Sequence, residues 1–153
     1  MNIGRESDAF AAFVEGVEVR LRVALTAVFG PETGRDAAAA ALLYGWEHWD
    51  ELSVMANPAG YLYRVGRSSQ RRKKEPDWLP VPQASDPVIE PGLPAAIASL
   101  SEKQRIAVVL VHAYGWSRRE VADLTGVSVS SLDTHLARGL SRLRGALGVQ
   151  IDA

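Results

Sequence analysis

The chain has 153 residues, of which 47% are hydrophobic and 23% are charged, a composition typical of a globular protein rather than a disordered one. It contains no cysteine, which excludes disulfides and thiolate metal sites, and no apolar run of the roughly 18 residues that a membrane span needs. The first seven residues lack the apolar segment of a signal peptide, so we expect a cytoplasmic protein without a membrane partner.

The net charge of −1 hides a strong segregation of charge along the chain. Residues 1–57 hold four basic and nine acidic side chains, whereas residues 58–74 hold six basic and no acidic ones. Residues 75–100 hold four acidic side chains only, and residues 101–153 hold seven basic and five acidic ones. A basic stripe beside an acidic block suggests two partners of opposite charge.

Apolar residues recur at intervals of three and four before the first proline-rich stretch, which predicts helices rather than strands. We expect a first helix that begins after Ser7, a good N-cap, and ends at the Gly-Pro pair 30–31. A second helix is expected over residues 36–52, with acidic side chains near its end. A third begins at Asn57, an N-cap followed by a proline suited to the first helical turn, and covers residues 59–74.

Six prolines between residues 75 and 94 then rule out a continuous helix and predict an extended linker. The sequence therefore predicts an all-α protein of two small helical domains. The first covers residues 1–74, the linker covers residues 75–92, and the second covers residues 93–153.

The second predicted domain has clear helix boundaries. The stretches 101–104 and 117–120 have the spacing of capping boxes, in which side chains satisfy backbone N–H groups at a helix start. Gly126 suits the left-handed residue after a helix, and Ser128 suits the N-cap of the last helix. A short helix, a glycine turn and an amphipathic helix in this order predict a helix-turn-helix bundle.

The last helix is the candidate DNA-reading element, because the second helix of such a motif buries one face and offers the other to a groove. Leucines at intervals of four, four, three and four form the buried stripe (Leu132, Leu136, Leu140, Leu143 and Leu147). Hydroxyl and guanidinium groups off that stripe suit phosphates and base edges. These candidate DNA contacts are Ser128, Ser130, Ser131, Thr134, His135, Arg138 and Arg142. The pattern also fits a helical hairpin with a solvated polar face, and Asp133 opposes DNA binding because phosphates repel a carboxylate.

The third helix combines aromatic and basic side chains. Tyr61 and Tyr63 alternate with arginines, an arrangement that suits base stacking and backbone contact along a single nucleic-acid strand. The alternative is a solvated helix end, where cations are also favourable.

The sequence contains no motif that predicts catalysis or metal binding. His48, His112 and His135 lack metal-ligand spacing, and no phosphate-binding, nucleophile or zinc-protease motif occurs. We therefore expect no metal, no cofactor and no catalytic residue, and do not expect an enzyme.

Four segments resemble the extracytoplasmic-function sigma factors of bacterial RNA polymerase. GWSRREVADLTGVSVSSLDTHLARGLSRLR and the preceding LSEKQRIAVVLVHAYG resemble the family's C-terminal promoter-reading domain. GRDAAAAALLYGWEHWDEL resembles its polymerase-binding helix, and NPAGYLYRVGRSSQRRKK resembles its promoter-melting helix. The segments follow the family's order and together cover most of the chain. The five alanines 37–41 and Asp133 depart from the family's more usual residues.

The resemblance implies a sigma factor that binds core RNA polymerase and directs promoter-specific initiation of transcription. It assigns the upstream promoter element to the last helix and implies polymerase contact through Trp46, Glu47 and Asp50. It implies contact with the melted downstream element through Asn57, Tyr61, Arg64, Arg67, Arg71 and Arg72. Core polymerase and promoter DNA are the implied partners, with an anti-sigma protein as an optional third.

Two other functions fit the same sequence. The first is a helix-turn-helix regulator that binds a palindromic site as a dimer without polymerase. The second is a degenerate sigma-like module for protein interaction, which Asp133 and the net charge of −1 favour.

Overall fold

The structure is a computed structural model that describes residues 3–70 and 92–148. All regular elements in these two ranges are helices. They are α1 (Ile3–Phe29), α2 (Pro31–Glu47), α3 (Trp49–Leu52), α4 (Pro58–Ser69), α5 (Leu93–Ala98), α6 (Glu102–Val108), the π-helical η1 (Val109–Ala113), α7 (Arg118–Thr125) and α8 (Val129–Leu147). We call α1–α4 the N-terminal half and α5–α8 the C-terminal half. None of these helices combines the length and apolarity needed to cross a bilayer.

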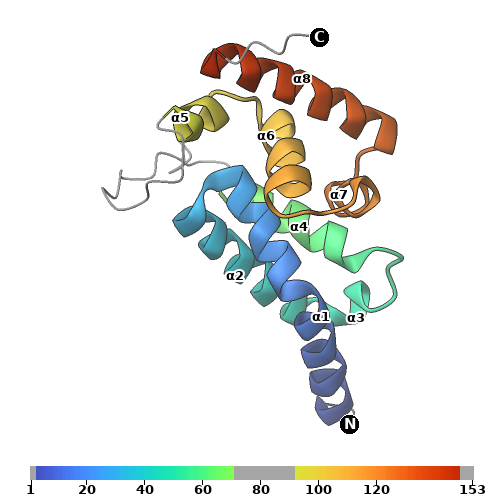
Figure 1. The fold of residues 1–153 in the computed structure, drawn as a ribbon. Helices are drawn as coiled ribbons and strands as arrows, with labels where there is room; N and C mark the ends of the chain where they lie inside the picture. The colour runs from blue at the N-terminus through green and yellow to red at the C-terminus, as the bar shows by residue number, and fades with distance from the viewer. Residues whose placement is uncertain (1–2, 71–91, 149–153) are drawn as a thin grey trace.

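The N-terminal half is built on an antiparallel hairpin of α1 and α2, against which α4 packs (Figure 1). The leucines Leu21, Leu25, Leu52 and Leu62 are fully buried at its centre. The N-terminal end of α1 projects beyond the other helices (Figure 1).

Glycine allows α1 and α2 to approach closely. A Cβ atom at Gly34 would lie 2.5 Å from the Thr26 Cα and 2.6 Å from the Thr26 backbone nitrogen. The one-residue turn between the helices is Gly30, whose φ of 93° is unfavourable for residues with a side chain.

The N-terminal helices are confirmed, with two differences in their bounds. Helix α1 begins at Ile3 rather than after Ser7, because nothing before Ser7 interrupts the helical pattern. Helix α2 begins at Pro31, whose missing N–H costs nothing in a first turn. The helix expected over residues 36–52 is divided at His48, whose φ of −120° and ψ of 25° leave the helical region.

The predicted caps of the C-terminal half are mostly confirmed. Ser101 and Gln104 form a complete capping box, and Ser117 accepts a hydrogen bond from the Glu120 N–H. Ser128 caps α8, and Gly126 has the expected left-handed φ of 76°. The turn between α7 and α8 therefore has the geometry of a helix-turn-helix.

The predicted leucine stripe of α8 faces the rest of the C-terminal half. Leu132, Leu136 and Leu143 are buried, and Leu140 and Leu147 are half-buried against them. Gly139 on the same face allows close contact with α6, since a Cβ there would lie 2.8 Å from a methyl carbon of Val108.

The two halves pack against each other through α1 with α6 and η1, and through α4 with α7. Their buried apolar residues form one core cluster. Helix α8 lies on the side of the C-terminal half that is remote from the N-terminal half (Figure 1). The linker predicted over residues 75–92 falls almost entirely outside the described residues.

Candidate nucleic-acid interface

The outer face of α8 presents most of the side chains predicted to contact DNA. Ser128, Ser130, Ser131, Thr134, Arg138 and Arg142 are exposed, and His135 is half-buried at the edge of the leucine stripe. A turn of 100° per residue accounts for this, because position 135 lies closer to the buried stripe than positions 134 and 138 do. The face that the sequence predicts is therefore present, with His135 at its border.

The hydroxyl groups at the start of α8 are already ordered among themselves. The Ser128 Oγ accepts from the Ser131 N–H at 3.1 Å and donates to the Ser131 Oγ at 3.0 Å. The Thr134 Oγ1 donates to the Ser130 carbonyl at 3.1 Å. This arrangement places several hydroxyls and the amide end of a helix at one exposed site, which suits a phosphate group.

Asp133 lies on this surface in an ion pair. Its carboxylate is 2.9 Å from the Nε of Arg118, at the start of α7, and both side chains are at least half exposed. The charge that opposes DNA binding in the sequence is thus balanced by a cation from the neighbouring helix. The sequence gives no sign of this pair because the two residues meet only through the angle between α7 and α8.

The exposed side of α4 forms the wall of a groove of about 510 Å³. It is lined by Tyr44, Tyr61, Arg64, Val65, Ser68 and Ser69. The Arg64 guanidinium lies 5.7 Å from the centre of the Tyr61 ring, a cation–π distance. The groove therefore joins an aromatic wall, a cation and two hydroxyls.

Tyr44 is a groove residue that the sequence did not indicate. Its hydroxyl lies 3.4 Å from the Tyr61 hydroxyl, and its ring stacks on His48 at 3.9 Å. The hydrogen bond with Tyr61 raises the pKa of Tyr44 above its ordinary value, and partial desolvation adds to the shift. The pairing joins residues 17 positions apart on two helices, so no local pattern could have revealed it.

The interpretation of Tyr63 as a base-stacking residue is wrong. Only 3% of this residue is exposed, and burial raises the pKa of its hydroxyl. Tyr61 and Tyr63 are two positions apart, which on a helix turns them to different sides. The aromatic and basic residues alternate in the sequence, but only Tyr61 shares the exposed side with Arg64.

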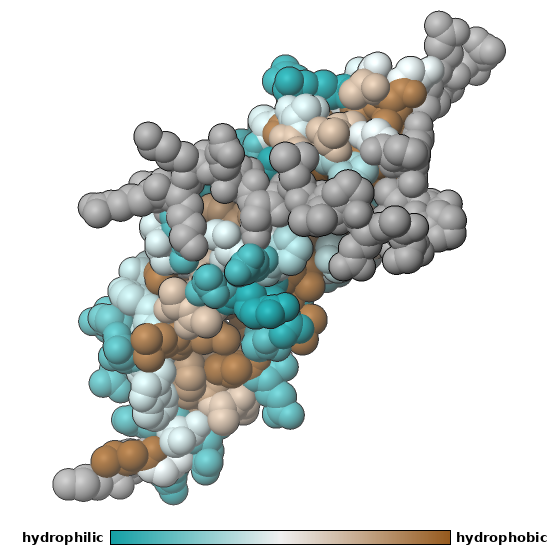
Figure 2. Space-filling view, turned by 90° about the vertical axis from the view of Figure 1, so that its left-hand side faces the viewer, coloured by the Kyte–Doolittle hydropathy of each residue, from teal (hydrophilic) through white to brown (hydrophobic). Residues whose placement is uncertain are grey.

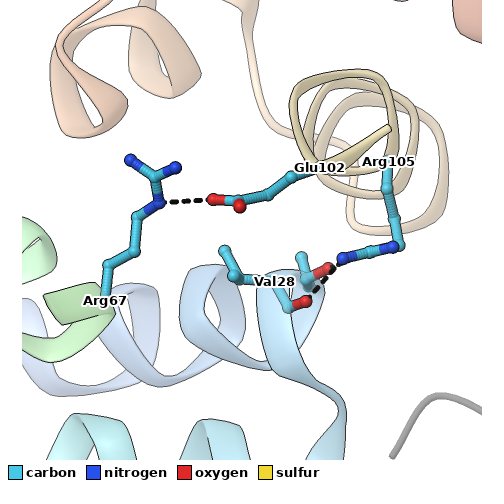
Figure 3. Close-up of polar contacts among 5 residues, drawn as sticks. Val28, Arg67, Glu102 and Arg105 are labelled. Carbon is cyan, nitrogen blue, oxygen red and sulfur yellow. Dashed lines mark hydrogen bonds and ion pairs between the residues drawn. The ribbon is translucent and has the colours of Figure 1, made fainter. Parts of the chain in front are cut away.

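Two residues predicted to contact the downstream element are bound by the C-terminal half. Asn57 caps α4 through its Oδ1, which accepts from the Gly60 N–H at 3.0 Å, and its Nδ2 donates to the Asp123 carbonyl at 2.7 Å. Arg67 pairs with Glu102, and this hydrogen bond raises the pKa of the arginine (Figure 3). Arg71 and Arg72 lie outside the described residues.

Arg105 forms the buried part of the same contact. It donates from Nε to the Ala27 carbonyl at 3.0 Å and from a terminal nitrogen to the Val28 carbonyl at 2.7 Å (Figure 3). Only 5% of this residue is exposed, and burial lowers the pKa of its guanidinium. The role of Arg105 is not predictable from the sequence, because a basic residue in a helix gives no sign of the surface it meets.

The residues implied in polymerase contact lie at the end of α2 and the start of α3. Glu47 and Asp50 are exposed, and Trp46 is 45% exposed with its ring 5.4 Å from that of Phe10. Leu43, one turn before Trp46, is 60% exposed. Apolar surface gathers on the N-terminal half in the face shown by Figure 2. Acidic and apolar side chains thus share one surface.

Comparison with known proteins agrees with this arrangement. Residues 92–143 match the family model of sigma-70 region 4. No curated protein matches the sequence significantly. Among solved structures, the chain is similar to the sigma factor RpoE in a complex with the anti-sigma factor NepR from Bartonella quintana. The identity is 23% and the TM-score is 0.63, over 94% of this chain and 99% of that chain. Residues 92–143 are thus similar to sigma-70 region 4, and the overall fold is that of a solved sigma factor.

Proposed function

We propose that this protein binds core RNA polymerase and directs it to promoters through two DNA-contacting surfaces. The observation that carries the proposal is the exposed polar face of α8, which lies on a region 4 domain and consists of hydroxyl and guanidinium groups. The surface of α4 and the surface at the end of α2 extend the proposal to promoter melting and to polymerase binding.

The upstream promoter element is assigned to α8. Ser131, Thr134 and Arg138 are exposed together on the side opposite the leucine stripe. An arginine in the major groove can donate two hydrogen bonds to the O6 and N7 of a guanine. The hydroxyls at the start of the helix would fix the helix on the phosphate backbone.

The melted downstream element is assigned to α4 and its groove. The ring of Tyr61 offers a surface on which an unpaired base can stack, and Arg64 beside it offers a charge for the backbone. Ser68 lines the same groove and can donate to a base edge or to a phosphate, whereas the Ser69 hydroxyl already donates to the Gly66 carbonyl at 2.7 Å. Strand opening would draw on the free energy of these contacts, so the proposal needs neither a cofactor nor ATP.

The polymerase is assigned to the surface around the end of α2. Trp46 and Leu43 supply partly exposed apolar area, and Glu47 and Asp50 supply negative charge at its edge. An apolar centre with a charged rim is the usual composition of a protein interface. An anti-sigma protein is a further partner for this chain, and we place the protein in the cytoplasm, where polymerase and promoter DNA are found.

The direct test is reconstituted transcription. The protein would be overproduced, the induced transcripts sequenced, and their promoters transcribed in vitro with core polymerase and the purified protein. We expect initiation at a shared promoter sequence, and loss of initiation in an Arg138→Ala variant that remains folded by circular dichroism. Tight binding of a palindromic site by the protein alone, without polymerase association, would instead support a dimeric regulator. Absence of both activities would support an interaction module.

A further inference from the structure

Asp133 and Arg118 each stand at a position that is unfavourable for their own charge. Arg118 is the first residue of α7, where the partial positive charge of a helix start repels a cation. Asp133 lies in the first turns of α8, the helix that we assign to duplex DNA, where phosphates repel a carboxylate. The start of α8 lies beside α7 (Figure 1), and the two charges meet there at 2.9 Å. Each residue therefore compensates the charge of the other.

Stability does not explain this ion pair. The side chains of Arg118 and Asp133 are 58% and 50% exposed, and exposed ion pairs contribute little to the free energy of unfolding. The pair does change what α8 presents to DNA. Because an arginine–carboxylate pair has no net charge, phosphates do not repel it as they repel a lone carboxylate. A carboxylate can therefore stand on this helix without preventing DNA binding.

Asp133 belongs to an exposed row of residues on the flank of α8 nearest α7. Ser130 precedes it by three positions and Ala137 follows it by four, so the three residues adjoin on the helix surface, and all three are exposed. Since Ser130 and Ala137 are short, the carboxylate of Asp133 projects furthest from this row. The N-terminal part of a recognition helix is the part that contacts base edges. Asp133 is thus placed to meet a base.

A carboxylate distinguishes bases by the hydrogen-bond donors that they present. In the major groove guanine presents two acceptors, and thymine presents an acceptor and a methyl group, so either base leaves a carboxylate unpaired. Adenine presents a donor beside the acceptor N7, whereas cytosine presents its N4 amino group with no acceptor next to it. Arg118 pairs with the Oδ1 of Asp133, and the second carboxylate oxygen can accept from a base. This chemistry favours cytosine.

We propose that Asp133 determines specificity by accepting a hydrogen bond from the N4 amino group of a cytosine in the upstream element, and that Arg118 is a positioning residue that holds the carboxylate for this contact. The inference rests on the proposed function of α8 and names the base that this flank of the helix reads. The selectivity comes mainly from rejection, because guanine or thymine at this position leaves the carboxylate without a donor. Asp133 thus provides sequence preference at some cost in affinity.

The test measures base preference with the full chain bound to core polymerase. Promoter fragments carry each of the four base pairs in turn at every position of the mapped upstream element, and competition binding gives their relative affinities. We expect the parent to bind one cytosine fragment roughly fivefold to thirtyfold more tightly than the fragments with guanine or thymine at that position. Asp133→Ala removes the acceptor and should reduce this ratio to about twofold or less. The matched control is Glu120→Ala, which removes an acidic side chain from an exposed position on α7 and should keep the ratio of the parent.

N4-methylcytosine tests the atom that the carboxylate contacts. Its methyl group takes the place of the amino hydrogen that points into the major groove, and the base still pairs with guanine. The parent should bind this fragment more weakly than the cytosine fragment, by a factor similar to that for the guanine fragment. Asp133→Ala should bind the methylated and unmethylated fragments alike. Equal binding of both fragments by the parent would overturn the contact with N4.

The positioning role is tested by Arg118→Gln against Arg119→Gln, since each variant removes one cation from an exposed position at the start of α7. Both variants should lose affinity for all fragments, because both lose a charge that attracts phosphates. Only Arg118→Gln should also reduce the preference for cytosine, because a carboxylate that is no longer held turns away from the phosphates. The same preference in both variants would overturn the role of Arg118.

Failure of this inference is distinct from failure of the proposed function. If the parent is selective in the upstream element and Asp133→Ala has the same preference at every position, the role of Asp133 is overturned and the proposed function stands. If the parent shows no preference at any position of the upstream element, the proposed function is contradicted, and the role of Asp133 is overturned with it.

Discussion

Arg138 is the residue on which the proposed reading of the upstream element depends most. We expect Arg138→Ala to lose about 1–3 kcal/mol of binding to the upstream duplex if the side chain reads a base. The loss would be specific to one base pair. If the side chain contacts only phosphate, the loss should be uniform across sequences, and the salt slope should fall by about one.

Fluorescence anisotropy over a series of single-base variants of the duplex distinguishes these two results. The control is Arg144→Ala, which removes the same charge from an exposed position about 120° away around α8. If both variants bind like the parent, α8 does not present this face to DNA.

A second prediction for a single residue concerns Asp133. Replacing it with asparagine removes a charge that phosphates repel and also releases Arg118 from its 2.9 Å ion pair. We expect Asp133→Asn to bind the duplex modestly more tightly, with a salt dependence that is steeper by about one counterion. Weaker binding would show that the carboxylate instead holds Arg118 in a useful position. The Asp133→Asn, Arg118→Ala double variant separates the two effects, because it cannot gain from a released arginine.

Individual site residues were predictable where their role depends on one helix. Ser128 and Arg138 follow from a cap signal and a leucine period, and both are found exposed as that pattern requires. Asn57 was identified as a cap, but its bond to Asp123 spans 66 positions and follows from no local rule. The burial of Tyr63 does not follow from the alternation of aromatic and basic residues along the sequence, because burial depends on the side of the helix on which a residue lies.

The helices themselves pack at distances that specific glycines permit. We expect Gly34→Ala to lower the free energy of unfolding by about 1–3 kcal/mol, because the added carbon would lie 2.5 Å from backbone atoms that cannot turn away. The matched control is Gly145→Ala in α8, where nothing lies within 4 Å of the added carbon. There we expect a gain of about 0.5–1 kcal/mol from helix propensity. Urea unfolding measures the free energy of unfolding of each variant. Equal changes in the two variants would show that α1 and α2 are not in close contact.

Helix bounds were predictable to the extent that they carry a chemical signal. Asn57, Ser101 and Ser128 each accept the expected backbone hydrogen bond at a helix start. The division at His48 carries no proline or glycine, so the sequence reads as one continuous helix there. The π-helical turn η1 was likewise hidden, because its apolar residues have the same spacing as an ordinary α-helix.

The whole molecule is expected to bind polymerase through the end of α2. Glu47→Lys combined with Asp50→Lys should weaken association with core polymerase, since both carboxylates are exposed and lie beside the partly exposed Trp46. Native gel shift or sedimentation of the complex measures this. The control is Glu15→Lys with Glu32→Lys, which makes the same change of charge at exposed positions elsewhere on the N-terminal half. Equal affinity of the two double variants would place the polymerase surface elsewhere.

Arg105 also limits how freely the halves of this protein can be exchanged for others. A helix-turn-helix grafted in place of the C-terminal half would bring its own recognition residues and could keep its own promoter preference. Unless it also presented an arginine to the carbonyls of Ala27 and Val28, the end of α1 would be left without its partner. Chimeric proteins built on this N-terminal half should therefore have a weaker contact between their two halves, and a graft that keeps this contact requires that Arg105 of α6 be transferred along with α8.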